Sequence, residues 1–352
     1  MKTRSKITLL IVIFGLLSSI VTFSTIHDDV EPSEIEIREE SVSSVPTSSG
    51  PEVHLFNSIK TNWTYNQEEA NKLRSLLESE CNTTNIFLTT QENVQLRERL
   101  HFEGQRRAFV YVFPNVFERF PKNMPFGMKS FKRCSLVGNS GILLGSQCGR
   151  SIDLADFVIR FNLASVQKFS EDVGSKTDLV TCNPSILIQK YDKLRGKWGE
   201  RFKEYMVAEY SKSIVYIPAF SYYFCKDLAF AAQDALEPLN FTVGFPHPNL
   251  ITLVTSFWKA RNISEFRITS GLLLFSAAMS FCEEVHLYGY WPFLEDPDGN
   301  PIYYHYFDKH AVMLSPQQLK ICHHDFPAEF TTLRDLHNKG VIRMHVGKCN
   351  LS

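Results

Sequence analysis

Two histidines in the last part of the chain, His305 and His324, have the residue type and neighbours for acid–base chemistry. His324 is followed five positions later by Glu329, with Pro327 between them. Histidine exchanges protons near neutral pH, so it can take a proton from a hydroxyl group or stabilise a departing anion. His323 stands beside His324, and the spacing to Glu329 favours His324 of the two.

A glycine turn earlier in the chain has the features of an anion site. Apolar residues 135–137 run into Gly-Asn-Ser-Gly at 138–141, a helical pattern follows, and 157–159 is a second apolar run. This order predicts a strand, a turn, a helix and a strand. The N–H groups at a helix start favour anions, and glycines let a ligand approach the backbone. Neither a dinucleotide fingerprint nor a P-loop is present, and an ordinary strand-to-helix turn is the alternative.

A second predicted helix starts at Thr269-Ser270-Gly271. Hydroxyl residues at such places usually cap the helix, and they can also donate hydrogen bonds to an anion at its positive end. Trp291 follows the apolar run 285–290 and would either offer a flat ring face to a ligand or fill the core.

Four segments, taken in order, resemble the sialylmotifs of the sialyltransferases in the form found in the α-2,8 group. A single motif can arise by chance, whereas an ordered set spanning about residues 110–349 is typical of the family. The similar segments are 134–162 for the large motif, 268–293 for the small, 305–308 for the third and 324–329 for the very small motif.

The resemblance implies roles for these residues. His324 would take the proton of the acceptor hydroxyl, His305 would contact the departing phosphate, and Glu329 would orient its surroundings or support the local fold. The donor substrate would be CMP-sialic acid, with Trp291 against the cytosine. Its binding residues would be Gly138, Asn139, Ser140, Asn162, Asn183, Thr269, Ser270, Gly271, Trp291 and His305.

Two positions depart from the family's pattern. Phe161 stands where cysteine is common, and we expect it to pack. Thr269 and Ser270 reverse the usual order of the two hydroxyl residues, which leaves open which hydroxyl meets which donor atom.

The implied activity is inverting transfer of sialic acid to the 8-hydroxyl of a terminal sialic acid on a glycolipid or glycoprotein glycan. It needs no covalent intermediate. One rival reading is a metal-dependent nucleotide-sugar transferase of the same compartment. The other is an inactive relative that binds glycans or CMP-sialic acid. EDTA sensitivity tests the first rival, and a turnover assay tests the second.

Metal ligation has two candidate sites in the sequence. Asp296-Pro-Asp298 could be a metal-binding Asp-x-Asp, but Asp-Pro-Asp-Gly is also a strong turn sequence. Cys322 precedes two histidines, yet no second Cys/His pair stands at zinc-ligand spacing. We therefore expect no metal and no cofactor.

Eight cysteines allow 105 disulfide connectivities, among which the sequence alone cannot choose. The resemblance implies that Cys134 pairs with Cys282 and that Cys148 pairs with Cys349. The remaining cysteines, which we expect to be buried or to form an extra bridge, are Cys81, Cys182, Cys225 and Cys322.

The N-terminus carries an apolar segment at 7–26, preceded by Lys2, Arg4 and Lys6. A transmembrane helix needs ~20 such residues, and the basic flank predicts a cytosolic N-terminus. A cleaved signal peptide is the alternative. An uncleaved anchor would make this a type II protein of the Golgi membrane with a lumenal catalytic domain. The sequons Asn62, Asn82, Asn240, Asn262 and Asn350 agree with a lumenal location.

The domain organisation follows from these patterns. We expect a cytoplasmic tail at 1–6, the anchor at 7–26, a stem at 27–104 with a helix at about 66–80, and a catalytic domain at 105–352. Alternating strands and helices predict an α/β fold with a mainly parallel sheet flanked by helices. The resemblance implies a Rossmann-like, GT-A-like variant. Strands are expected at 135–137, 157–161, 179–181, 214–217, 285–290 and 341–345.

Charge bears on the partners and the product. The formal net charge of −1 gives no sign of nucleic-acid binding. The stretch 217–241 holds Lys226 against Asp227, Asp234 and Glu237, so it should repel a long polyanion. We expect one or a few sialic acids per acceptor, with a ganglioside or short O-glycan preferred because of the aromatic run 222–224. The resemblance leaves room for a homodimer.

Overall fold

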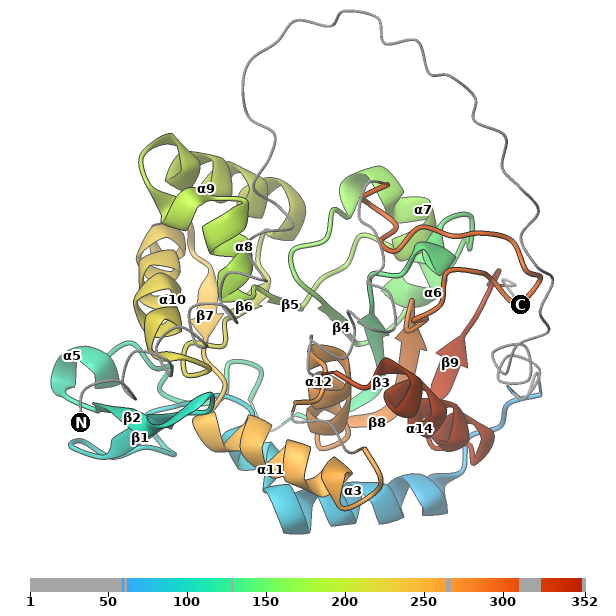
Figure 1. Ribbon diagram of the computed structural model, residues 1–352, viewed down its shortest axis with the longest axis horizontal. Coiled ribbons are helices and arrows are strands. Elements are labelled where there is room, and N and C mark those ends of the chain that lie inside the picture. The colour runs from blue at the N-terminus through green and yellow to red at the C-terminus, as the bar shows by residue number, and fades with distance from the viewer. Residues whose placement is uncertain (1–58, 60–61, 128, 264–266, 310–323, 350–352) are drawn as a thin grey trace, which may run out of the picture. The chain divides into compact units, whose positions relative to one another are not determined.

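The computed structural model describes residues 59, 62–127, 129–263, 267–309 and 324–349. A seven-stranded sheet with the order β7-β6-β5-β4-β3-β8-β9 forms its centre, and every pairing within it is parallel (Figure 1). The parallel sheet flanked by helices is confirmed, with β7 as an additional strand. The strands are β3 (Phe131–Val137), β4 (Phe157–Arg160), β5 (Leu179–Thr181), β6 (Ile214–Tyr216), β7 (Thr242–Gly244), β8 (Cys282–Tyr288) and β9 (Arg343–His345).

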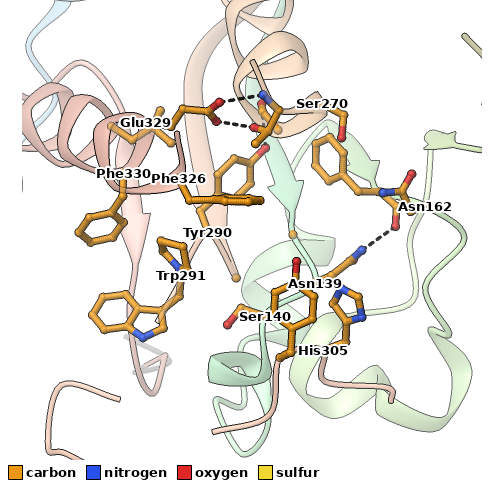
Figure 2. A pocket seen from close by; sticks show the side chains of 18 residues that line it. Asn139, Ser140, Asn162, Ser270, Tyr290, Trp291, His305, Phe326, Glu329 and Phe330 are labelled. Atoms are coloured by element: carbon orange, nitrogen blue, oxygen red, sulfur yellow. Dashed lines mark hydrogen bonds between the residues drawn. The ribbon is translucent and has the colours of Figure 1, made fainter. Parts of the chain in front are cut away.

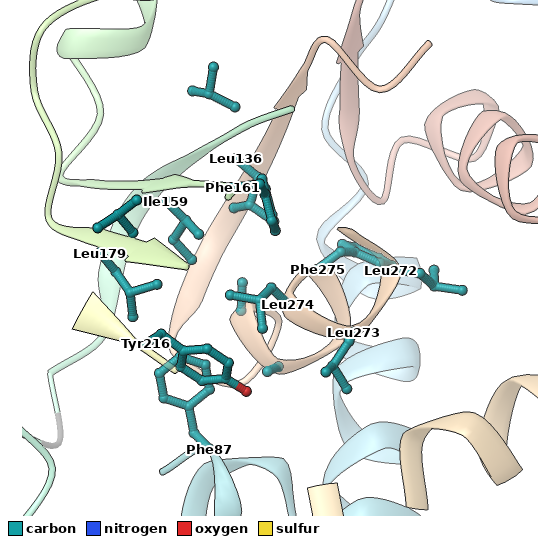
Figure 3. Close-up of a cluster of buried hydrophobic side chains, with 14 of the residues drawn as sticks. Phe87, Leu136, Ile159, Phe161, Leu179, Tyr216, Leu272, Leu273, Leu274 and Phe275 are labelled. Carbon is teal, nitrogen blue, oxygen red and sulfur yellow. The ribbon is translucent and has the colours of Figure 1, made fainter. Parts of the chain in front are cut away.

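The central strands are mainly apolar toward their carboxyl ends because both of their faces are covered there. All residues of β4 and β5 are buried. α12 (Ser270–Ala278) is apolar on all sides, as expected for a helix with no solvent face, and its residues from Leu272 onward are buried. Figure 3 shows side chains of α12, of the sheet and of Phe87 in one hydrophobic cluster.

Helices connect the strands and enclose the sheet. The helix expected from Gly271 onward is confirmed as α12. In Figure 1, α14 lies beside β9, and α3 runs alongside α11. The other helices are α3 (Gln67–Cys81), α4 (Thr83–Ile86), α5 (Pro114–Phe117), α6 (Gly149–Asp153), α7 (Ser170–Val173), α8 (Pro184–Gln189), α9 (Lys197–Tyr210), α10 (Tyr223–Leu236), α11 (Pro248–Lys259) and α14 (Phe326–Asn338).

The helix expected at about 66–80 is present as α3. Asn66 caps it by accepting a hydrogen bond from the Glu69 N–H at 3.2 Å. Leu73 and Leu77 are buried against the rest of the core, because an apolar stripe at helical spacing needs a partner surface. The segment predicted as stem, 27–104, therefore contains residues that pack with the domain.

A small antiparallel hairpin precedes the main sheet. It consists of β1 (Arg99–Phe102) and β2 (Gln105–Tyr111). Its turn contacts the loop before α10, where the Gly104 N–H donates to the Ser221 carbonyl at 2.8 Å. The sequence did not predict this hairpin.

Both implied disulfides are present, Cys134–Cys282 and Cys148–Cys349. Cys81, Cys182 and Cys225 are free and buried, as small apolar residues often are. Burial raises the pKa of each of these thiols, to about 12 for Cys182. Cys322 lies outside the described residues.

Among the described residues no helix is both long and apolar enough to cross a membrane. The predicted anchor, 7–26, lies outside them, as does the sequon asparagine Asn350. The asparagines of the other four sequons, Asn62, Asn82, Asn240 and Asn262, are exposed.

Candidate active site

The site lies at the carboxyl ends of β3 and β8, where the strand order reverses. β3 pairs along one edge with β4, the next strand of the sheet in the chain. Along its other edge it pairs with β8, which comes much later in the chain. Such a switch point in a parallel sheet leaves a crevice between diverging loops, and ligands bind there. The chain leaves β3 at Gly138 and leaves β8 at Gly289.

The two loops approach each other closely at these glycines. The Gly138 N–H donates to the Tyr288 carbonyl at 2.7 Å, and a Cβ on Gly138 would lie 2.5 Å from the Gly289 oxygen. A Cβ on Gly141 would lie 2.2 Å from the Tyr303 oxygen. The glycines were expected to admit a ligand to the backbone. In the structure this space is used by the chain itself, although Gly138 also lines a cavity.

The helical stretch expected between the two strands is divided between a 3-10 turn, η1 (Gly141–Leu143), capped by Ser140, and the short helix α6. Gly145 then takes a left-handed conformation, with φ of 72°, which ends the helical run. Anion binding at residues 138–140 stays a prediction, and all three of these residues line the cavity described below. The N-terminus of α12 also faces that cavity.

A cavity of about 190 Å³ brings together residues from all four motif segments (Figure 2). Most of the predicted donor-binding residues line it, and it also has an aromatic lining that the sequence analysis did not identify. The lining residues are Gly138, Asn139, Ser140, Phe161, Asn162, Thr269, Ser270, Gly271, Gly289, Tyr290, Trp291, Pro292, Tyr304, His305, Phe326, Glu329, Phe330 and Leu333.

Two asparagines line the cavity beside β4. The Asn139 Nδ2 donates to the Phe161 carbonyl at 3.1 Å, and within the described residues its buried Oδ1 accepts no hydrogen bond. Asn162 has a left-handed backbone with φ of 58°, and its N–H donates to the Thr181 hydroxyl at 2.9 Å. Phe161 is buried and packs against Tyr290, as expected for a packing residue.

One face of α14 forms a wall of the cavity. Phe326, Glu329, Phe330 and Leu333 recur at the spacing that places side chains on a single helix face. Burial raises the pKa of Glu329 to about 7, while hydrogen bonds from Thr269 act in the opposite direction. These bonds come from the Thr269 N–H, at 2.8 Å, and from its hydroxyl (Figure 2).

The two swapped hydroxyl residues differ in their contacts. The Thr269 hydroxyl donates to Glu329 and accepts the Leu272 N–H, so it caps α12. Ser270 is the hydroxyl residue that lines both this cavity and a neighbouring one.

His305 lies on the loop that follows β8. Its ring stacks on Tyr304 with centroids 4.4 Å apart and on Phe307 at 5.1 Å. Burial lowers its pKa, and Asp308 acts in the opposite direction. The loop is held against the β3 turn by the Tyr306 N–H, which donates to the Asn139 carbonyl at 2.9 Å.

Trp291 lines the cavity but is only 4% exposed. Its indole packs edge-on against Phe293 and Phe330, and its Nε1 donates to the Glu295 carbonyl at 2.8 Å. Core filling accounts for these contacts.

A second cavity, of about 280 Å³, adjoins the first at Ser270. Asn183 and His324 line this cavity rather than the first one, together with Arg267 and the aromatic residues Tyr216, Tyr222 and Phe224. The predicted chemistry is therefore divided between two neighbouring spaces, with His305 in one and His324 in the other.

The tautomer of His324 follows from its backbone contact. Its Nδ1 lies 2.9 Å from the carbonyl oxygen of Arg267, which can only accept a hydrogen bond. In a neutral ring the proton is therefore on Nδ1, and Nε2 is the basic nitrogen.

The Asp296 segment forms the predicted turn. The Asp296 Oδ1 accepts the N–H groups of Asp298 and Asn300, at 2.9 and 2.8 Å. Among the described residues, no group of three His, Cys, Asp or Glu side chains is placed to hold a metal ion.

Comparisons with known proteins gave consistent matches. The model of glycosyltransferase family 29 (sialyltransferase) matches residues 86–341. A solved structure described as "Crystal Structure of a Mammalian Sialyltransferase" aligns with 85% of this chain and 96% of its own, at 19% identity and a TM-score of 0.44. "Alpha-2,8-sialyltransferase 8E" of Homo sapiens is 36% identical over 90% of this chain and 84% of its own length. "Alpha-N-acetylneuraminide alpha-2,8-sialyltransferase" of Xenopus tropicalis is 39% identical over 82% and 81%.

Proposed function

This chain belongs to glycosyltransferase family 29, the sialyltransferases, and on that premise we propose that it is an α-2,8-sialyltransferase. It transfers sialic acid from CMP-sialic acid to the 8-hydroxyl of a terminal sialic acid on a glycolipid or glycoprotein glycan. The observation that carries the proposal is the convergence of the four motif segments on two adjoining cavities that share Ser270.

The first cavity suits the donor. The buried Oδ1 of Asn139 is an acceptor for a nucleoside N–H or hydroxyl group. The N-terminus of α12, with Ser270 and Gly271, favours the phosphate. His305 provides a further hydrogen bond to the phosphate as negative charge builds up on it. Asn183 lines the second cavity, which supports a contact with the transferred sugar or the acceptor rather than with the nucleotide.

The second cavity suits the acceptor and the base. His324 removes the acceptor hydroxyl proton through Nε2, because the Arg267 carbonyl holds the proton of the neutral ring on Nδ1. The hydroxyl oxygen attacks the anomeric carbon as the bond to CMP breaks, and the configuration inverts. Glu329 acts indirectly. It accepts two hydrogen bonds from Thr269 and thereby holds the start of α12 in position.

We propose that catalysis needs no metal ion. The Asp296 carboxylate is engaged in its own turn, which supports a structural role for the Asp-Pro-Asp segment. The test is an assay of the full-length chain, with CMP-sialic acid and a panel of sialylated acceptors, with and without EDTA. We expect an α-2,8-linked product in both conditions. Loss of turnover with EDTA would support the metal-dependent rival, and donor binding without turnover would support the inactive relative.

We also propose that residues 7–26 anchor the chain in the Golgi membrane with the catalytic domain in the lumen. Two disulfides and four exposed sequon asparagines support an oxidising, glycosylating compartment. Protease protection of the domain in sealed Golgi vesicles, together with a mobility shift after deglycosylation, is the expected result. Digestion of the domain in sealed vesicles would contradict it.

A further inference from the structure

Arg267 brings a positive charge into the second cavity, beside the proposed base. Its Nη2 donates to Glu103 Oε2 and to the Ser221 hydroxyl, both at 3.0 Å. Its guanidinium carbon lies 5.9 Å from the centre of the Tyr222 ring. Its carbonyl oxygen also accepts from His324, so one residue contacts the base through its backbone and, through its side chain, two residues that line the same cavity, Ser221 and Tyr222.

The negative partner of Arg267 lies outside this cavity. Glu103 lines a different cavity, and its side chain is only 13% exposed. No Asp or Glu is among the described residues that line the second cavity. Among described partners, the guanidinium donates hydrogen bonds only through Nη2, so its planar fork can still engage a second carboxylate.

We propose that Arg267 binds the carboxylate of the acceptor's terminal sialic acid, and so selects sialylated acceptors over neutral ones. This inference rests on the proposed function, in which the acceptor sugar is itself an acid. A guanidinium forms charge-assisted, often bidentate hydrogen bonds with a carboxylate, and partial burial strengthens them. Glu103 holds the side chain in position from behind.

The experiment compares two forms of one acceptor on the full-length chain, the free acid and the methyl ester of its terminal sialic acid. The wild-type chain should prefer the acid by about 10- to 100-fold in kcat/KM, since a hydrogen-bonded charge is lost in the ester. Arg267→Gln should raise the KM for the acid and reduce this preference to near one. The KM for CMP-sialic acid should not change. Arg267→Lys, which keeps the charge without the fork, should retain part of the preference.

Arg261→Gln is the matched control. Arg261 pairs with Glu80 at 2.6 Å and lines neither cavity, so this variant also loses an arginine–glutamate pair. It should keep the wild-type preference for the acid.

Each other outcome has a definite reading. Equal use of acid and ester by the wild-type chain would overturn the inference without any variant, and the proposed function would stand. A raised donor KM in Arg267→Gln, with the preference for the acid unchanged, would assign Arg267 to the donor's carboxylate and also overturn it. If the wild-type chain transfers to no sialylated acceptor, the proposed function itself fails, and this inference fails with it.

Discussion

Individual contacts determine the protonation of each side chain in the site. His324 donates to a backbone carbonyl, while His305 stacks on two aromatic rings and is kept neutral by burial. Glu329 has a pKa of about 7 because it is buried, although it accepts two hydrogen bonds from Thr269. These differences support the proposed roles of His324 as the base, His305 as the phosphate contact and Glu329 as a positioning residue.

Replacement of His324 by alanine should abolish transfer and spare donor binding. A positioned general base contributes about 10²- to 10⁴-fold to the rate. Because His324 lines the second cavity and not the first, the affinity for CMP should stay within about twofold of wild type, a change worth well under 1 kcal/mol. Turnover and CMP binding of the purified variant give the answer. Retention of more than about a tenth of wild-type turnover would exclude His324 as the base.

The KM for CMP-sialic acid should depend on pH through His305. Burial lowers the pKa of this ring in the free protein. A bound phosphate favours the charged ring and raises its pKa, so donor binding takes up a proton. The donor KM should therefore fall as the pH is lowered toward and below the ordinary histidine pKa of about 6.5. His305→Gln should remove this dependence, and His101→Gln, at an exposed position, should not.

Local patterns in the sequence predicted part of the site. His324 and Glu329 were found from their spacing, because both belong to one segment at the start of α14. The Thr269 hydroxyl also donates to a carboxylate 60 positions away in the chain, a contact that no local pattern could assign to Thr269 rather than to Ser270. Tyr290, Tyr304, Phe326 and Phe330 line the cavity but were not predicted, because each resembles an ordinary core residue in the sequence.

At the scale of elements, the Cys134–Cys282 bridge joins β3 to β8, the two strands whose ends form the switch point. Cys134→Ala with Cys282→Ala should lower the free energy of unfolding by about 2–5 kcal/mol and raise the donor KM. The pair Cys148→Ala with Cys349→Ala is the comparison. Both pairs should lose stability in denaturant titrations, but the second should change the donor KM less. A free Cys134 thiol in the active wild-type chain would refute the assignment.

The accuracy of the strand predictions follows from burial. β4 and β5 were found because both of their faces are covered, so each reads as a mainly apolar run. β7 has only three residues, ends in glycine and begins with an exposed threonine, so it lacks that signal. The hairpin β1–β2 was missed because charged and polar residues interrupt its apolar positions.

At the scale of the whole molecule, the buried His286 and its partly buried neighbour His345 should make the fold sensitive to acid. Burial lowers the pKa of His286 to about 3 and that of His345 still further, and the two rings share a hydrogen bond of 3.1 Å. The unfolded chain binds protons near pH 6.5 while the folded chain does not. Stability is therefore fully present above about pH 6.5 and falls below it, by up to ~1.4 kcal/mol per pH unit for each ring. His345→Phe, which can still stack on Tyr288, should make the decline less steep.

The products should carry one or a few added sialic acids. In the 217–241 stretch, Lys226 is paired with Asp227 at 2.7 Å, and Asp234 is paired with Arg119 at 2.7 Å. No net positive track remains among these groups to hold a growing polyanion. Chromatography of the products on a sialylated acceptor is the check, and a ladder beyond about ten units would contradict the prediction.

The pairing of β3 with β8 also determines how early the two strands of the switch point can join during synthesis. β3 can pair with β4 almost at once, but its other edge and Cys134 must wait for a partner 148 positions later. At translation rates of about 5–20 residues per second, this interval lasts roughly 7–30 s. During it Cys134 can react with Cys148, Cys182 or Cys225, which emerge earlier than Cys282. Efficient maturation of the chain therefore depends on disulfide exchange and on protection of an unpaired strand edge until β8 arrives.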